Sequence, residues 1–381
     1  MSEKTNRSGP VSPIPVDVRT TLEIDLARVR RNWRKLDNTA AAATCAAVVK
    51  ANGYGLGLEE IITAVAAEGC RIFFVATLEE GRRARIAANK AEIYIMDGLL
   101  ADAEAYYSNF DLRPVLSSAE EIADWTCFCT SQGRRLPAAL HVDTGMRRLG
   151  VPLDEFMQMA GPQDLLSTFE LTLLMSHLTS ANQPEDPQNQ LQLQRFEQAR
   201  SVVPGVRCSL ANSAGIFLGP EFHFDVVRPG IAIYGGRAFN GKNPMANVVK
   251  LNARILEVQC AEAGDTVGYG AVHRLTRPSR IATVAVGYAD GLLRVLGGDE
   301  TAHGALAFIG DHQVPVIGRI SMDLTTLDVT DVPEHLARRG GWIEMIGDHV
   351  TVDDLADRAG TIGYEILTRL GPRMHRIYHE A

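Results

Sequence analysis

Short apolar runs recur along the first 235 residues, and helical patterns of apolar residues lie between them. Counting the run that ends at Lys50, there are eight: Val48 to Lys50, Phe73 to Thr77, Ile93 to Asp97, Arg113 to Ser117, Ala138 to Asp143, Leu171 to His177, Arg207 to Ser213 and Val226 to Tyr234. Eight strand-helix units in roughly 210 residues predict a (β/α)₈ barrel near the short end of the usual size range. An open doubly wound sheet is the structural alternative, but it seldom has eight consecutive units without a GxGxxG turn.

The pattern changes after Gly235-Gly236, where short alternating segments predict a mostly β domain. Its expected strands are Asn252 to Val258, Ile281 to Val286, Gly304 to Ile309, Val314 to Ile320 and Thr325 to Val329, with one helix at Asp353 to Ala359. An earlier predicted strand, Arg19 to Ile24, could belong to the β domain although it precedes the barrel in the sequence. Asp25 is expected to cap a helix from Leu26 to Leu36 that ends at Asp37-Asn38. We therefore expect a disordered tail at residues 1–15, a barrel at 16–238 and a β-rich domain at 239–381.

Composition excludes several classes of protein. The 381 residues are 46% hydrophobic, and 38 basic against 46 acidic side chains give a net charge of −8. This acidic balance argues against nucleic-acid and anionic-membrane partners. No apolar segment reaches the roughly 18 residues needed to span a bilayer, and residues 1–15 contain no signal-peptide core. Six scattered cysteines predict free thiols in a reducing cytoplasm, and the histidine spacing gives no reason to expect a metal site.

Polar residues lie at or just after the downstream ends of the predicted strands, where barrel enzymes place their chemistry. These residues are Lys50, Asp97, Ser117, Asp143, His177, Asn212, Ser213 and Arg228. A lysine that follows a buried strand can reach solvent, or its pKa can be lowered so that its amine forms a Schiff base. Eight polar residues in the same relative position favour one shared site.

The stretch from Val48 to Gly57 resembles the cofactor-lysine motif of alanine racemases, which are fold-type III enzymes that use pyridoxal 5'-phosphate (PLP). The resemblance implies that Lys50 bonds covalently to the cofactor and that Tyr54 contacts its phosphate. Leu56 departs from the pattern, because the family usually has histidine there.

Two further segments continue the resemblance. His141 to Gly150 is similar to the family's DTGM-x-RLG motif, which implies that Arg148 reaches the cofactor and the substrate carboxylate. His141 replaces a lysine that is carbamylated in many members, and imidazole cannot form that carbamate, so a different group must orient Arg148. The resemblance places His177 beneath the pyridine ring, whereas Asn182 stands where many members have an aspartate in the access path.

The last barrel strands resemble the family's phosphate site and ring-nitrogen site. The implied cofactor contacts are Asn212, Ser213, Gly230, Ile231, Tyr54 and Tyr364, with Arg228 facing the pyridine nitrogen. An arginine keeps its proton, so that nitrogen must accept a hydrogen bond and stay unprotonated. A carbanion at Cα is then short-lived, which favours racemisation over transamination.

In the β domain, Gly268-Tyr269-Gly270 resembles the family's second catalytic segment. Inverting a stereocentre requires a base on each face of the substrate; Lys50 serves one face, and the resemblance assigns the other to Tyr269. In the family this tyrosine comes from the partner subunit, which implies a homodimer with shared sites. The resemblance also places Met322 at the substrate carboxylate and Tyr288, Arg294, Arg319 and Tyr364 around the entrance.

We therefore expect a cytoplasmic, PLP-dependent alanine racemase that supplies D-alanine for peptidoglycan. An amino-acid racemase of other or broader specificity, such as one acting on serine, is the alternative. A fold-type III decarboxylase would need an acidic partner for the ring nitrogen, which Arg228 cannot provide. A non-catalytic PLP carrier would lack the β domain and a counterpart of Tyr269.

Overall fold

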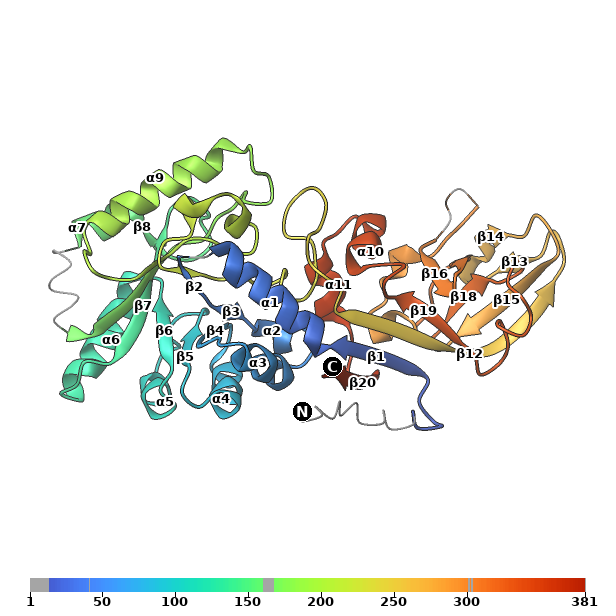
Figure 1. Cartoon of the computed structure of the whole chain (residues 1–381), viewed down its shortest axis with the longest axis horizontal. Coiled ribbons are helices and arrows are strands. Elements are labelled where there is room, and N and C mark those ends of the chain that lie inside the picture. The colour runs from blue at the N-terminus through green and yellow to red at the C-terminus, as the bar shows by residue number, and fades with distance from the viewer. Residues whose placement is uncertain (1–13, 41, 160–167, 301, 303, 381) are drawn as a thin grey trace, which may run out of the picture. The chain divides into compact units, whose positions relative to one another are not determined.

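The protein is described from a computed structural model that covers residues 14–40, 42–159, 168–300, 302 and 304–380. The chain divides into two compact units: the barrel unit is Val29–Ala246, and the β unit holds the residues up to Arg28 and from Asn247 onward. Figure 1 labels their helices and strands. Most of the predicted disordered tail, residues 1–13, lies outside the described residues.

The barrel unit is built on parallel strands in the order β3-β4-β5-β6-β7-β9-β10. Its strands are β2 (Thr44–Cys45), β3 (Ala47–Val48), β4 (Ile72–Val75), β5 (Glu92–Ile95), β6 (Arg113–Leu116), β7 (Pro137–Asp143), β8 (Val151–Pro152), β9 (Glu170–Met175), β10 (Cys208–Ser209) and β11 (Val226–Val227). The helices are α1 (Leu26–Ala40), α2 (Lys50–Tyr54), α3 (Leu58–Ala67), α4 (Leu78–Ala87), α5 (Glu104–Asn109), α6 (Ala119–Ser131), α7 (Leu153–Gln158) and α9 (Pro187–Ser201), with 3₁₀ turns at Gly215–Phe217 and Pro220–Phe222.

Backbone hydrogen bonds continue the sheet around to its first strand. β11 pairs in parallel with β2, and the Arg228 N–H donates to the Ala211 carbonyl next to β10. β11 has only two residues, so the regular part of the barrel is partial. The prediction of a (β/α)₈ class is confirmed, although the expected eighth strand to Tyr234 was too long because Ile231 to Gly235 form turns after Pro229-Gly230.

The core of this unit explains why its sequence forms buried parallel strands. All four residues of β4 are buried, which fits a strand covered on both faces. Phe74 from β4 and Tyr94 from β5 stack inside, with ring centroids 4.9 Å apart. Thr77 and Ser118 cap α4 and α6, because their hydroxyls accept from backbone N–H groups of the first turn.

The β unit contains a sheet in the order β17-β16-β19-β12-β1-β20, with β15 paired to β12 and β18 paired to β15. Its strands are β1 (Thr20–Asp25), β12 (Val249–Ala261), β13 (Thr266–Val267), β14 (His273–Arg274), β15 (Ser279–Val284), β16 (Leu306–Ile309), β17 (His312–Pro315), β18 (Thr325–Asp328), β19 (Trp342–Ile346) and β20 (His375–His379). It also has helices α10 (Val352–Ala359) and α11 (Gly363–Arg369) and 3₁₀ turns η3 (Tyr269–Ala271), η4 (Tyr288–Asp290) and η5 (Arg294–Leu296). A mostly β second domain is therefore confirmed.

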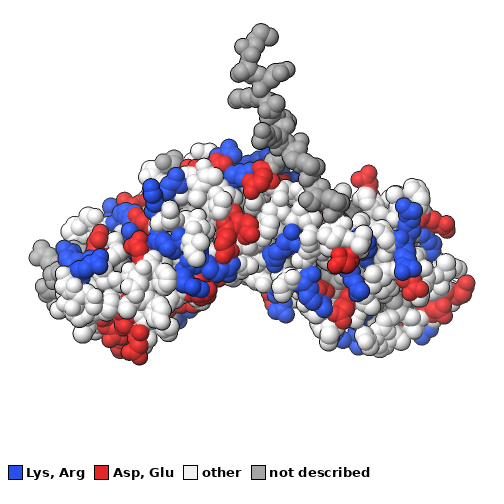
Figure 2. All heavy atoms as spheres, turned by 90° about the horizontal axis from the view of Figure 1, so that it is seen from below, with Lys and Arg blue, Asp and Glu red and all other residues white. Residues whose placement is uncertain are grey.

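Charges of both signs occur on one face of the molecule (Figure 2). On the face drawn in Figure 2, basic and acidic side chains are interspersed without a broad area of one sign. Among the described residues, no helix combines the length and the apolar character that crossing a membrane requires.

Candidate active site

Lys50 lies two residues after β3 and is followed by a left-handed turn. Ala51, Asn52, Gly53 and Tyr54 have φ values of 53°, 55°, 63° and 52°. Left-handed backbone costs a non-glycine residue about 1–2 kcal/mol. The turn must therefore be stabilised by its surroundings.

Glu80 and Arg83 of α4 provide that stabilisation. One Glu80 carboxylate oxygen accepts from the Asn52 N–H and the other from the Ala76 N–H, each at 3.0 Å. Arg83 donates to the Asn52 side-chain oxygen at 2.9 Å and pairs with Glu59. Sequence reasoning missed both residues, because Thr77-x-x-Glu80 resembles an ordinary capping box and nothing in the pattern indicates that Glu80 reaches Asn52.

The Lys50 side chain is half-buried. Burial lowers its pKa, the neighbouring Arg148 guanidinium lowers it further, and Asp97 and Glu80 oppose the shift. A lysine with a lowered pKa presents more of the neutral amine that nucleophilic catalysis requires.

The Tyr54 side chain extends from the left-handed turn towards Ser213, Gly230 and Tyr234, at and after the last barrel strands. Its ring stacks on Tyr234 with centroids 4.4 Å apart. An added Cβ on Gly230 would lie 2.1 Å from the Tyr54 hydroxyl oxygen, so glycine is required for this close approach. The Ser213 hydroxyl accepts from the Gly230 N–H at 2.8 Å. A phenol, a hydroxyl and backbone N–H groups are thus gathered in one place, as phosphate binding requires.

Arg228 is 3% exposed and is held by neutral oxygens. Its guanidinium donates to the Ser209 hydroxyl and to the Ser176 carbonyl. Burial lowers its pKa to about 9. No carboxylate pairs with it among the ion pairs of the described chain, so an acceptor from outside the protein would complete its environment.

His177 follows β9 and is neutral. Burial lowers its pKa well below the usual value, and Arg228 and Arg148 lower it further. The Asn212 amide nitrogen lies 3.5 Å from His177 Nε2, while the Asn212 oxygen accepts from the Gly215 N–H. The amide orientation therefore makes Nε2 the accepting nitrogen of the ring.

The 143–148 loop presents Arg148. One Asp143 carboxylate oxygen accepts from the N–H groups of Gly145, Met146 and Arg147 at 2.8, 2.8 and 3.1 Å. The Arg148 side chain is exposed in this unit, yet its charge contributes to the lowered pKa of Lys50 and of His177.

The residues that depart from the family pattern lie in three different settings. His141 is buried in β7, and burial followed by the charge of Arg228 lowers its pKa to about 4. Leu56 is fully buried, whereas Asn182 is exposed. A neutral imidazole therefore replaces the lysine expected at position 141.

The remaining predicted site residues belong to the β unit. Tyr269 in η3 is 71% exposed and Met322 is 54% exposed, and Tyr288 and Tyr364 are also exposed. Gly268 and Gly270 flank Tyr269 with φ values of 76° and 77°, so the tyrosine is held on a tight turn of left-handed glycines. The predicted residues thus form one group in the barrel unit (Lys50, Tyr54, Arg148, His177, Asn212, Ser213, Arg228, Gly230 and Ile231) and an exposed group in the β unit.

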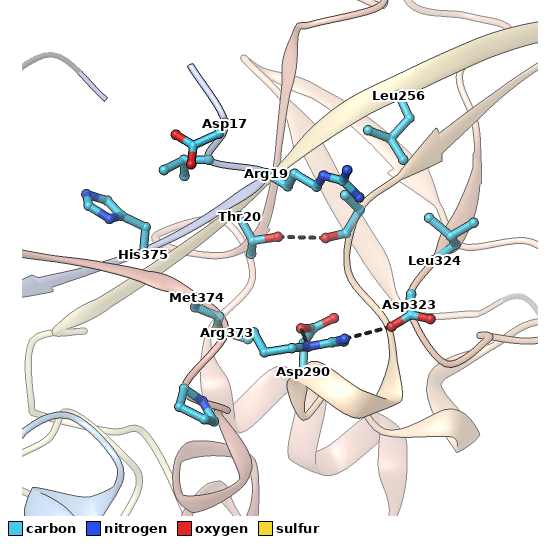
Figure 3. A pocket seen from close by; sticks show the side chains of 13 residues that line it. Asp17, Arg19, Thr20, Leu256, Asp290, Asp323, Leu324, Arg373, Met374 and His375 are labelled. Carbon is cyan, nitrogen blue, oxygen red and sulfur yellow. Dashed lines mark hydrogen bonds and ion pairs between the residues drawn. The ribbon is translucent and has the colours of Figure 1, made fainter. Parts of the chain in front are cut away.

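A hollow of about 810 Å³ in the β unit is lined by Asp290 and Asp323, which are labelled in Figure 3 and lie close in sequence to Tyr288 and Met322. Arg373 donates to Asp290 and to Asp323, both at 2.8 Å. These bonds join the turn that carries Tyr288 to the loop that carries Met322. The hollow contains none of the predicted catalytic side chains, and three of the charged groups that line it, Arg373, Asp290 and Asp323, pair with one another.

Comparison of the sequence and the structure with known proteins identifies the family. The family model described as "Alanine racemase, N-terminal domain" matches residues 24–238, and "Alanine racemase, C-terminal domain" matches 248–378. The chain belongs to the alanine racemase family. It is 45% identical to the alanine racemase of Rhizobium meliloti (strain 1021) over 374 residues, which covers 96% of this chain and 98% of the relative.

Two further relatives extend the match. The biosynthetic alanine racemase of Agrobacterium fabrum is 45% identical over 364 residues, covering 94% of this chain and 93% of the relative. The crystal structure of alanine racemase from Bartonella henselae, which holds covalently bound pyridoxal phosphate, has a TM-score of 0.89 and 36% identity, and covers 95% of this chain and 100% of that one. These matches confirm the predicted family, the enzyme class and PLP as the cofactor. The close approach of Tyr54 to Gly230 and the buried Arg228, which has no carboxylate partner among the described residues, fit such a group.

Proposed function

We propose that this chain is a PLP-dependent alanine racemase that interconverts L-alanine and D-alanine. The observation that carries the proposal is a strand-end lysine of lowered pKa in the same unit as a buried arginine whose hydrogen-bond partners among the described residues are neutral. The first supplies an amine for covalent attachment, and the second supplies a fixed positive group for a ring nitrogen. Membership of the alanine racemase family supports alanine as the substrate.

The barrel unit would hold the cofactor. Tyr54, Ser213 and the backbone N–H groups of Gly230 and Ile231 would bind its phosphate, with Tyr364 of the β unit contributing a hydroxyl. When bound, PLP supplies an electron sink that acidifies the Cα–H bond of the substrate. Arg148 and Met322 would bind the substrate carboxylate.

Two bases on opposite faces would invert the stereocentre. The Lys50 amine would exchange the proton on one face, and the hydroxyl of Tyr269 of the partner subunit would exchange it on the other. Tyr269 is 71% exposed on its own unit, so its hydroxyl is available to the site of a partner subunit, as the proposed homodimer requires. Tyr288, Arg294 and Arg319 would then line the entrance.

Arg228 would direct the reaction towards racemisation. Because its guanidinium keeps its proton when it faces a ring nitrogen, it can only donate to that nitrogen. Less negative charge is then delocalised into the ring, and prompt return of a proton to Cα is favoured over transfer elsewhere.

The physiological role that we propose is the supply of D-alanine for peptidoglycan in the cytoplasm. The biosynthetic name of the Agrobacterium fabrum relative supports the role. All six cysteines are free, and four of them are buried, which suits a reducing compartment. Rescue of a D-alanine auxotroph by this chain, and no rescue by its Lys50→Ala variant, is the expected result.

The direct test is chiral chromatography of a panel of L-amino acids incubated with the purified holoenzyme. Alanine should racemise fastest, and Lys50→Ala should lose both turnover and the visible absorbance of covalently bound cofactor. Faster racemisation of serine would favour the alternative of different specificity. Cofactor binding without racemisation of any amino acid would contradict an enzymatic function and favour a PLP carrier.

A further inference from the structure

Gln192 of α9 is a fully buried amide whose two ends are both hydrogen-bonded. Its nitrogen donates to the His177 carbonyl at 2.9 Å and to the Thr144 hydroxyl at 3.1 Å. Its oxygen accepts from the Thr179 N–H at 2.8 Å and from the Thr179 hydroxyl at 3.0 Å. A carbonyl can only accept and an N–H can only donate, so just one orientation of the amide satisfies these groups. The glutamine thus fixes the backbone on both sides of Leu178.

The same network reaches Arg228 through buried hydroxyls. Thr144 and Ser176 join their hydroxyl oxygens at 2.7 Å, and both residues are 1% exposed. The Ser176 carbonyl in turn accepts from Arg228. The consecutive residues Ser176 and His177 are therefore held from two directions, by Arg228 inside the barrel and by Gln192 from α9.

Helix α9 also holds the loop that presents Arg148. Arg195 donates to the Thr144 carbonyl at 3.0 Å. An added Cβ on Gly145 would lie 2.7 Å from the side-chain nitrogen of Gln188, so α9 packs directly on this turn. One face of α9 thus contacts both of the loops that carry His177 and Arg148.

We propose that Gln192 is a positioning residue for racemisation, acting through His177 and Arg228. This inference rests on the proposed function. Gln192 fixes the position of the His177 backbone. Through Thr144 and Ser176 it also fixes the carbonyl that accepts from Arg228. Displacement of a positioned group by about 1 Å can reduce turnover 100-fold. A buried amide that satisfies four partners leaves little freedom for such a displacement.

Gln192→Met tests the proposal, because methionine has a similar volume but cannot donate to the His177 carbonyl, and its thioether is only a weak acceptor for the Thr179 N–H. Gln194→Met is the matched control, since Gln194 lies on the exposed face of the same helix. In PLP-saturated holoenzyme, we expect Gln192→Met to lower kcat for alanine by about 10- to 100-fold. Transamination should rise relative to racemisation, and the visible circular dichroism of the bound cofactor should change. Gln194→Met should match the wild type in all three.

Thr144→Val provides a second route if Gln192→Met folds poorly. It removes one hydroxyl from the path to Ser176, whereas Thr144→Ser retains it. We expect Thr144→Val to shift the transamination ratio in the same direction, Thr144→Ser to behave as the wild type, and the Gln192→Met/Thr144→Val double variant to be less than additive.

Lower thermal stability in Gln192→Met and Thr144→Val, with wild-type kcat, transamination ratio and cofactor dichroism in the folded holoenzyme, would overturn the proposal. A wild-type protein that binds PLP without racemising alanine would instead refute the proposed function. The dichroism of Gln192→Met would still decide whether this residue orients the site.

Discussion

Replacing Glu80 with glutamine should weaken cofactor binding without touching the cofactor. The carboxylate accepts from two backbone N–H groups, those of Asn52 and Ala76, with one oxygen each. An amide has only one oxygen, so its NH₂ group must face one of these N–H groups, donor to donor. At least one charge-assisted hydrogen bond is lost.

The expected magnitude follows from the strain in the Lys50 turn. Three of its four left-handed residues, Ala51, Asn52 and Tyr54, are not glycine, which costs roughly 3 kcal/mol or more in total. A hydrogen bond to a charged group contributes about 1.5–3 kcal/mol, so losing one lets the turn relax in the cofactor-free protein. Binding must then restore the turn. At 1.4 kcal/mol per factor of ten, the apparent dissociation constant for PLP should rise about 10- to 100-fold.

Equilibrium dialysis of PLP against the cofactor-free protein measures this change. Glu79→Gln is the matched control, because Glu79 is the preceding residue on α4 and pairs only with the exposed Arg82 among its described contacts. Circular dichroism in the far ultraviolet should show that both variants are folded. An unchanged dissociation constant for Glu80→Gln would refute the view that Glu80 holds the strained turn.

Two other predictions concern buried cationic and imidazole groups. Arg228→Glu should raise transamination relative to racemisation by at least tenfold, which corresponds to about 1.4 kcal/mol between the two barriers. The ratio of pyruvate to D-alanine formed from L-alanine measures this change, and an unchanged ratio would contradict the prediction. For His141, burial and then Arg228 lower the pKa to about 4, whereas an unfolded histidine titrates near 6.5, so stability is lost as the pH falls from about 6.5 to 4. His141→Asn should remove up to about 3 kcal/mol of this acid-induced loss of stability. Thermal melts between pH 7 and 4.5 measure the effect, with His335→Asn at an exposed site as the control. The same pH dependence in both variants would contradict the prediction.

Much of the fold could be predicted because parallel barrel strands are short runs of buried residues. Phe73 and Phe74, for example, lie in a run that is buried throughout. Element ends were harder to predict. The first helix continues to Ala40 beyond the expected stop at Asp37-Asn38, because Leu36 and Ala40 both pack in the core and tertiary burial outweighs a weak local stop signal.

In the β domain, the strands at 342–346 and 375–379 and the helix at 363–369 were not predicted from the sequence. β20 pairs in parallel with β1, which lies more than 350 residues away in sequence according to the register of Thr21 with His375. No local pattern carries such long-range pairing. Its residues are only half-buried, so the apolar alternation that marks other strands is weak.

The site shows the same division. Residues at strand ends, such as Lys50 and Arg228, could be proposed for the site from their position after apolar runs. Gln192 and Glu80 could not, because each lies on a helix and acts on a loop from another part of the chain. Hydrogen bonds between distant segments become visible only in three dimensions.

The account depends most on Lys50 and Tyr269 acting on opposite faces of the substrate. The most direct measurement is exchange of the Cα hydrogen of L-alanine and of D-alanine with deuterium oxide in the Tyr269→Ala holoenzyme, followed by mass spectrometry and chiral chromatography. The account predicts that one enantiomer still exchanges, through Lys50, without inversion, while the other loses exchange. Wild-type exchange of both enantiomers, or inversion at the wild-type rate, would contradict it.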